Sequence, residues 1–223
     1  MKSEQVSPYF LYNLEMFRIF VELSDRHWNE ETIKYNESDI EMDEPTSCGR
    51  YQYRTDLSAH FQEIFPQYQK QSYLLMLMSL FEDYLNQLCN SLHFENEFCC
   101  SLKDYNGSGI ERAKKYLGKV AKISVPTGKN SWNTIISAKD IRNIVAHNAG
   151  HLDKDSHKKQ LQLVAQNPDL DFEENARIHL NIINQDYLLN VIKSMEEIAE
   201  VLCDNTMKTY HATYHAIHEI KGG

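Results

Sequence analysis

The chain carries its most chemically capable side chains within ten residues, from Ile141 to Gly150. Arg142 and Asn143 are adjacent, and His147 follows Arg142 after four intervening residues. An imidazole that titrates near neutral pH can accept or donate a proton, and a guanidinium can hold a phosphate through two hydrogen bonds. These groups suit cleavage of RNA without a metal, in which the ribose 2′-hydroxyl attacks the phosphorus and the 5′-oxygen leaves. The products would be a 2′,3′-cyclic phosphate and a 5′-hydroxyl.

The spacing of these residues predicts where their helix must end. Asn143 and His147 share a helical face, whereas Arg142 and His147 are five residues apart, about 140° around the helix axis. Gly150 predicts a helix end just after His147, because glycine favours the left-handed conformation found there. His147 would then lie in the last turn, facing a common cleft or a second subunit. Two copies related by a two-fold axis would bring two histidines and two arginines together.

The spacing alone favours a structural role for the same residues. A histidine in the last turn of a helix gains from the helix dipole, and a surface arginine often pairs with an acidic residue. An arginine and a histidine at this spacing also occur by chance in many chains.

The charge distribution favours a local site for an anion. The chain has a net charge of −9, but residues 101–160 carry 12 basic and 5 acidic side chains, a net charge of +7. The overall charge disfavours a general coat for nucleic acid but permits a local phosphate-binding surface in that segment. The residues that we predict to bind substrate beside Arg142 and His147 are Lys115, Lys119, Lys139 and Asn148.

The composition indicates an ordinary globular protein. Hydrophobic residues make up 42% of the chain, and eight glycines and five prolines are too few for a turn-rich all-β fold. No apolar run approaches the ~20 residues of a membrane span, and the N-terminus lacks the layout of a signal peptide. Five cysteines without CxxC spacing indicate reduced, structural thiols. We therefore expect a cytoplasmic protein that makes no contact with a membrane.

The hydrophobic pattern predicts one helical domain over residues 1–223. A first helix should begin at Ser7 and Pro8, with Phe10, Leu14, Phe17 and Val21 on one stripe and Met16, Phe20 and Leu23 beside it, and weaken after His27. Residues 36–50 are acidic and indicate an exposed loop, and residues 56–65 predict a short helix that Pro66 stops. The strongest helical pattern runs over residues 67–92 and has two apolar stripes, which is typical of the central helix of a bundle.

The second half of the chain predicts further helices and one strand. The expected helices are a basic one over residues 110–122, one from Asn130 or Ser131 into the Arg142–His147 stretch, a short one over 157–166 and a long one over 187–208. Residues 177–182 alternate polar and apolar side chains, which indicates a small β-ribbon. The predicted fold class is therefore all-α, with a small β-ribbon as an addition.

The sequence Arg142-Asn143-Ile144-Val145-Ala146-His147 resembles the signature of the HEPN superfamily (higher eukaryotes and prokaryotes nucleotide-binding domain). That signature is an arginine, an adjacent polar residue and a histidine after four to six residues. The expected order of helices is also similar, with a long central helix that contains Phe81-Glu82-Asp83-Tyr84-Leu85. The resemblance covers residues 65–208, so that 1–60 form an N-terminal extension and 209–223 a C-terminal tail.

The resemblance implies an up-and-down helical bundle that is commonly a homodimer. It implies that Arg142 and His147 are the catalytic pair at the dimer cleft, that Asn143 assists them, and that the protein is a metal-independent endoribonuclease acting on RNA. Such proteins serve in toxin–antitoxin and phage-defence systems, which implies an antitoxin or regulatory protein as a partner. Some members are inactive, so the alternative is a module that binds RNA, a nucleotide or a protein. A purely structural dimerisation bundle is a third interpretation.

Three histidines near the C-terminus form a second constellation. His211, His215 and His218 would share one face of a helix, and imidazoles at that spacing can ligate zinc or nickel. No carboxylate or cysteine nearby completes such a site. We therefore interpret the segment as a solvated terminal helix and expect neither a metal nor a cofactor.

Overall fold

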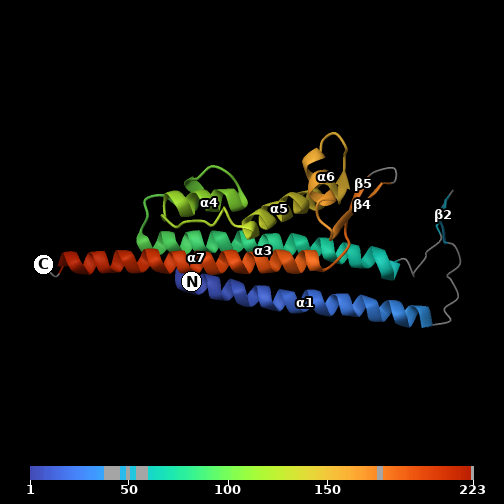
Figure 1. Ribbon diagram of the computed structural model, residues 1–223, viewed down its shortest axis with the longest axis horizontal. Coiled ribbons are helices and arrows are strands. Elements are labelled where there is room, and N and C mark those ends of the chain that lie inside the picture. The colour runs from blue at the N-terminus through green and yellow to red at the C-terminus, as the bar shows by residue number, and fades with distance from the viewer. Residues whose placement is uncertain (38–45, 49–50, 54–59, 175–177, 222–223) are drawn as a thin grey trace.

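Three long helices run side by side along the molecule (Figure 1). The computed structural model describes residues 1–37, 46–48, 51–53, 60–174 and 178–221, with side chains over 1–34, 60–173 and 178–209. The long helices are α1 (Ser3–Glu37), α3 (Phe65–Asn96) and α7 (Asp186–Lys221). On the side of α3 and α7 opposite α1 lie α4 (Gly109–Lys119), α5 (Asn130–Asn148) and α6 (Lys158–Ala165). The chain therefore forms three layers, with α3 and α7 in the middle.

The helices α1, α3, α5 and α7 alternate in direction along the chain (Figure 1). Ser3 at the start of α1 hydrogen-bonds Glu95 at the end of α3, and Trp28 near the other end of α1 donates to Gln69. Ser131 at the start of α5 donates to Glu197 of α7 at 2.6 Å. The predicted up-and-down arrangement of helices is thus present in the part of the chain that is described.

A single apolar core joins the three layers. The first stripe of α1 is buried, and α1 packs against α3 and α7. In α3 one predicted stripe is buried throughout, but the second is buried at Tyr73 and Tyr84, partly exposed at Leu80 and exposed at Met76. The central helix is therefore covered on most, but not all, of its circumference.

The prediction that the first helix begins at Ser7 is wrong, because α1 begins one turn earlier and encloses Pro8. The backbone N–H and the hydroxyl of Ser3 both donate to the Glu95 carboxylate, which anchors this extra turn on α3. The hydroxyl of Ser7 makes a buried hydrogen bond of 2.9 Å with the Tyr84 hydroxyl and does not cap the helix. The helix also continues ten residues beyond His27, to Glu37.

Pro66 begins a helix where the sequence predicted that it would stop one. It lies in the first turn of α3, where a missing N–H is tolerated, and His60–Ile64 form a π-helical turn before it. Residues 56–59 of the predicted short helix lie outside the described residues, as do residues 38–45 and 49–50 of the predicted loop. The strand β1 (Thr46–Cys48) lies within that predicted loop and pairs antiparallel with β2 (Tyr51–Tyr53), which follows it.

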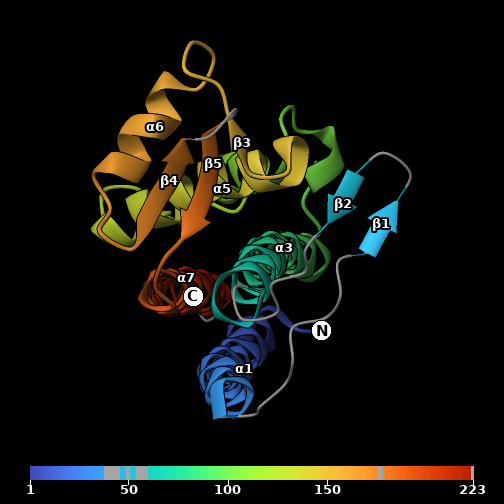
Figure 2. The same cartoon turned by 90° about the vertical axis from the view of Figure 1, so that its right-hand side faces the viewer.

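The predicted β-ribbon is a three-stranded antiparallel sheet (Figure 2). Its central strand is β5 (Ile178–Ile182), flanked by β3 (His151–Leu152) and β4 (Leu170–Glu174). Ile178, Leu180 and Ile182 are buried, which is the alternation seen in the sequence. The strand β3 directly follows α5, so the sheet is attached to the end of the Arg142–His147 helix. No helix in the described ranges is long and apolar enough to cross a membrane.

Candidate functional site

The helix α5 presents the predicted catalytic residues at its C-terminal end. Ile135, Ala138, Ile141 and Ile144 are buried in the core, which fixes the rotation of the helix about its axis. This rotation leaves Arg142 and Asn143 half-buried and His147 exposed.

Most N–H donors of the Arg142 guanidinium have no acceptor in the part of the chain that the structure describes. Its Nη1 donates to Asn143 Oδ1 at 3.1 Å, so the two predicted site residues are in contact. Its Nε is buried and has no acceptor among the described residues. A guanidinium has five N–H donors, so an arriving phosphate would find free ones.

His147 lies one residue before the end of α5 and has no hydrogen-bond partner within the described ranges. Because α5 is regular through Asn148, Arg142 and His147 leave the helix about 140° apart. One chain therefore does not direct both side chains to the same point by helix geometry alone.

The helix ends as the sequence predicted, but with two left-handed residues. Ala149 has a φ of 49° and Gly150 a φ of 79°. The N–H groups of both residues donate to the carbonyl of Ile144, and the Gly150 bond is 3.3 Å long. The reversal thus begins at Ala149, one residue before the predicted glycine.

Leu180 links this helix end to α3 through two hydrogen bonds. Leu180 of β5 donates its N–H to the Gly150 carbonyl at 2.9 Å. The Leu180 carbonyl accepts from Nε2 of Gln71, a buried residue of α3, at 3.1 Å. The sheet therefore holds the end of α5 against α3.

Two histidines outside the predicted site, His151 and His179, lie behind the helix end. His151 and His179 are register partners in the sheet, and their ring centroids are 5.1 Å apart. Burial lowers the pKa of His179, the nearby His151 lowers it further, and Glu173 opposes the shift. The alternating pattern of residues 177–182 placed His179 in a strand, but no local signal paired it with His151.

The predicted substrate-binding residue Asn148 is engaged by a third histidine. His157 Nδ1 accepts the N–H of Asp153 at 3.0 Å, and its Nε2 lies 3.1 Å from the Asn148 amide. The Asn148 atom nearest to Nε2 is Nδ2, and which of the two groups donates depends on the tautomer of His157. Asn148 therefore ties the loop before α6 to α5.

The predicted lysines lie near opposite ends of α5: Lys139 near its C-terminal end, and Lys115 and Lys119 on α4 near its N-terminal end. Lys139 is half-buried one turn before Arg142 and Asn143. Lys115 and Lys119 are exposed on α4, at the other end of α5. The neighbouring Lys114 shows that α4 lies beside the start of α5. Its Nζ is 5.9 Å from the centroid of the ring of Trp132, which is in the first turn of α5.

Trp132 precedes His147 by fifteen residues, about 22 Å along a helix. The fold therefore keeps Lys115 and Lys119 away from His147. Among the described residues no three His, Cys, Asp or Glu side chains group as a metal site would require. The side chains of His211, His215 and His218 lie outside the described part of the chain.

Comparison of the chain with protein-family models, with curated proteins and with solved structures finds no match.

Proposed function

We propose that the protein is a metal-independent endoribonuclease of HEPN type whose site is the C-terminal end of α5. The observation that carries the proposal is that Arg142 and His147 lie within two turns of one helix end. Among the described residues, Arg142 has unused donors and His147 has no hydrogen-bond partner. The +7 charge of residues 101–160 supports an anionic substrate.

The proposed reaction needs a proton acceptor, a proton donor and a group that stabilises the phosphate. A His147 imidazole takes the proton of the 2′-hydroxyl as that oxygen bonds to phosphorus, and the bond from phosphorus to the 5′-oxygen breaks. An imidazolium returns a proton to the leaving 5′-oxygen. Arg142 stabilises the charge that develops on the phosphate, and Asn143 orients its guanidinium.

A second copy of the chain completes this site in the proposal. Since Arg142 and His147 leave one helix in different directions, the arginine of one copy and the histidine of the other would act on one phosphate. A two-fold axis near the end of α5 would also supply two imidazoles, one as the base and the other as the acid.

One observation favours the alternative, a module that binds RNA or a nucleotide without turnover. Catalytic histidines are commonly oriented by a hydrogen bond to the second ring nitrogen, and His147 has none among the described residues. This alternative keeps the phosphate contact of Arg142 and omits the proton transfers.

The test is incubation of the purified protein with a mixed RNA pool in EDTA, followed by analysis of the product ends. We expect cyclic phosphate and 5′-hydroxyl ends, lost in His147→Ala and in Arg142→Ala. Matched controls are His27→Ala on α1 and Arg112→Ala on α4, because Arg112 also has a buried Nε without an acceptor in the described structure. Cleavage that persists in His147→Ala refutes the proposal. Binding of RNA that needs Arg142, without cleavage, supports the alternative.

A further inference from the structure

The helix α1 has a second apolar stripe, which is exposed. Tyr9, Tyr12, Met16, Ile19 and Leu23 follow one another at intervals of three and four residues, which is the spacing of a coiled-coil seam. Their exposed fractions lie between 40% and 61%. The first stripe of α1 is buried in the core, so this helix has two apolar faces, of which only one is covered by other described residues.

A groove extends this stripe towards α3. Met16 and Phe20 of α1 and Met76 and Leu80 of α3 line an open groove of about 460 Å³. Phe20 and Met76 are about half exposed. We call the five residues of the exposed stripe, together with Phe20 and Met76, the α1 face.

The α1 face is large enough for a stable interface between proteins. Its three half-exposed aromatic and four half-exposed aliphatic side chains present on the order of 500 Å² of apolar surface. A standard interface covers about 800 Å² on each partner, of which somewhat more than half is apolar. The exposed large apolar side chains of the described residues include none from α5, so the α1 face is the more apolar of the two surfaces.

We propose that a second copy of this chain docks on the α1 face, with the two α1 helices antiparallel about a two-fold axis at Met16. In this register each residue faces the one equally far on the other side of Met16. Tyr9 then faces Leu23 of the other copy, and Tyr12 faces Phe20. Met16 faces Met16 of the other copy and Ile19 faces Asn13, so every apolar residue of the stripe except Ile19 meets an apolar side chain.

The charges at the two ends of the stripe fit the same orientation. Arg26 follows the stripe and Glu4 precedes it, both exposed and without an ion-pair partner among the described residues. In the antiparallel register the Arg26 of each copy lies within about a turn of Glu4 of the other. Arg18 does not contribute to this pairing of charges, because it forms ion pairs with Glu15 at 3.2 Å and Glu196 at 2.5 Å within its own chain.

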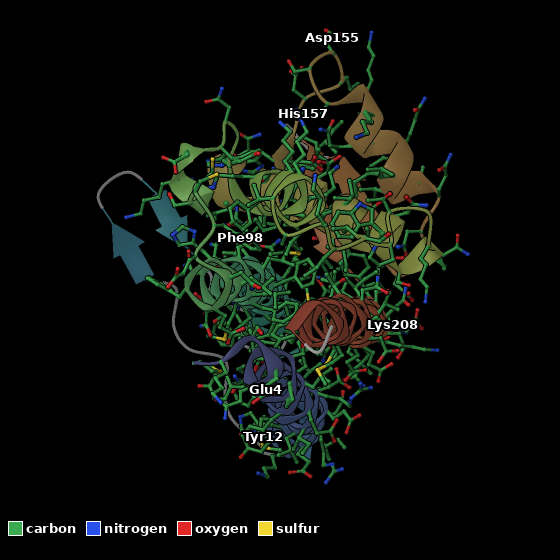
Figure 3. The ribbon with its side chains drawn as sticks, turned by 90° about the vertical axis from the view of Figure 1, so that its left-hand side faces the viewer. Glu4, Tyr12, Phe98, Asp155, His157 and Lys208 are labelled. Carbon is green, nitrogen blue, oxygen red and sulfur yellow. The ribbon has the colours of Figure 1, made fainter. Side chains whose placement is uncertain are left out.

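This interface is independent of the proposed function. Figure 3 shows Tyr12 on α1 and His157 beside the α5 end at opposite extremes of the molecule, with α3 and α7 between them. A dimer through α1 therefore leaves both Arg142–His147 sites facing outward. If the ribonuclease also pairs two α5 ends, the chain has two separate two-fold contacts and assembles into tetramers or longer arrays.

The first test is the solution mass of the full chain at roughly 100 µM, where a dimer with a micromolar Kd is formed. We expect at least twice the 26.1 kDa of one chain, and half of that mass in a Met16→Glu, Phe20→Glu double variant. The control is Phe94→Glu, which places the same charge on an exposed aromatic at the end of α3. A monomeric wild-type protein, or a double variant of unchanged mass, overturns the proposal. Loss of RNA cleavage has no bearing on either outcome.

A cross-linking experiment tests the orientation even if the double variant folds poorly. In a background with Cys48, Cys99, Cys100 and Cys203 changed to serine, Met16→Cys should form a dimeric disulfide on oxidation. Leu23→Cys should form one when mixed with Tyr9→Cys but not with itself. Efficient self-linking of Leu23→Cys would indicate parallel helices and contradict the proposed register.

Discussion

Gly150 lies directly against the imidazole of His179: a Cβ atom at Gly150 would be 2.8 Å from His179 Cε1. The contact joins the end of the proposed catalytic helix to the central strand of the sheet. It also explains why glycine stands at this position even though the left-handed turn begins at Ala149.

The close contact predicts opposite effects for two neighbouring substitutions. Gly150→Ala should lower the free energy of unfolding by about 2 kcal/mol, because it adds a clash to a left-handed φ. Ala149→Gly should raise it by up to about 1 kcal/mol, because Ala149 is exposed and already strained by its positive φ. Urea denaturation measures both changes. A Gly150→Ala protein as stable as the wild type would show that the contact is not close in solution.

The pKa of His179, lowered mainly by burial, predicts a loss of stability in mild acid. Above an unfolded-state pKa of about 6.5 the residue is neutral in both states. As the pH falls below that value, the unfolded chain binds a proton that the folded chain resists, so the free energy of unfolding decreases. Hydrogen bonds lower the pKa values of Asp104 and Asp153, so these residues change the free energy of unfolding only at lower pH, below about 4.

The measurement is denaturant unfolding between about pH 7 and pH 5. His179→Gln should reduce the slope of stability against pH, whereas His27→Gln, on the exposed face of α1, should leave it unchanged. Equal slopes in the wild type and in His179→Gln would contradict the assignment.

The buried hydroxyls of Ser7 and Tyr84 predict a coupled effect on stability. Tyr84→Phe should lower the free energy of unfolding by about 1–2 kcal/mol, because the Ser7 hydroxyl loses its side-chain partner. Adding Ser7→Ala should cost less than the sum of the two single changes. Burial also raises the pKa of Tyr84 well above its ordinary value, so this hydroxyl stays protonated under these conditions. Strict additivity would indicate that the two hydroxyls do not interact.

The position of α4 predicts a division between RNA binding and cleavage. The double variant Lys115→Ala, Lys119→Ala should bind RNA more weakly. The slope of the logarithm of its binding constant against the logarithm of salt concentration should become shallower by about one to two. The cleavage rate at saturating RNA should stay within about two-fold, since these lysines lie at the other end of α5 from His147. Lys139→Ala, one turn from Arg142, is the contrasting variant and should lower that rate. A many-fold loss of rate in the α4 variant would place those lysines at the site.

The amino-acid sequence by itself determined most of the helices and the place where α5 ends. Apolar residues at helical spacing located α3, α5 and α7, because burying one face requires that periodicity. Alternation located β5, and Gly150 located the end of the helix to within a residue. The predicted residues Arg142 and Asn143 are in contact because adjacent positions on a helix allow it.

Local sequence signals were insufficient to predict where α1 and α3 begin. Ser7 looked like a cap, but its hydroxyl bonds Tyr84, and Glu95 anchors the turn before it. Pro66 is compatible with either end of a helix, and the chain uses it at the start of α3. At the start of α1 the outcome depends on partners that are remote in sequence.

Tertiary structure alone decided what surrounds the site and which faces are left open. His151 and His179 meet through the register of a sheet, and Asn148 meets His157 through a loop. Both stripes of α1 are apolar in the sequence, but only the packing of α3 and α7 determines that Leu14 is buried and Met16 exposed. The physical reason is that periodicity is a property of one helix, whereas burial depends on which other segments cover it.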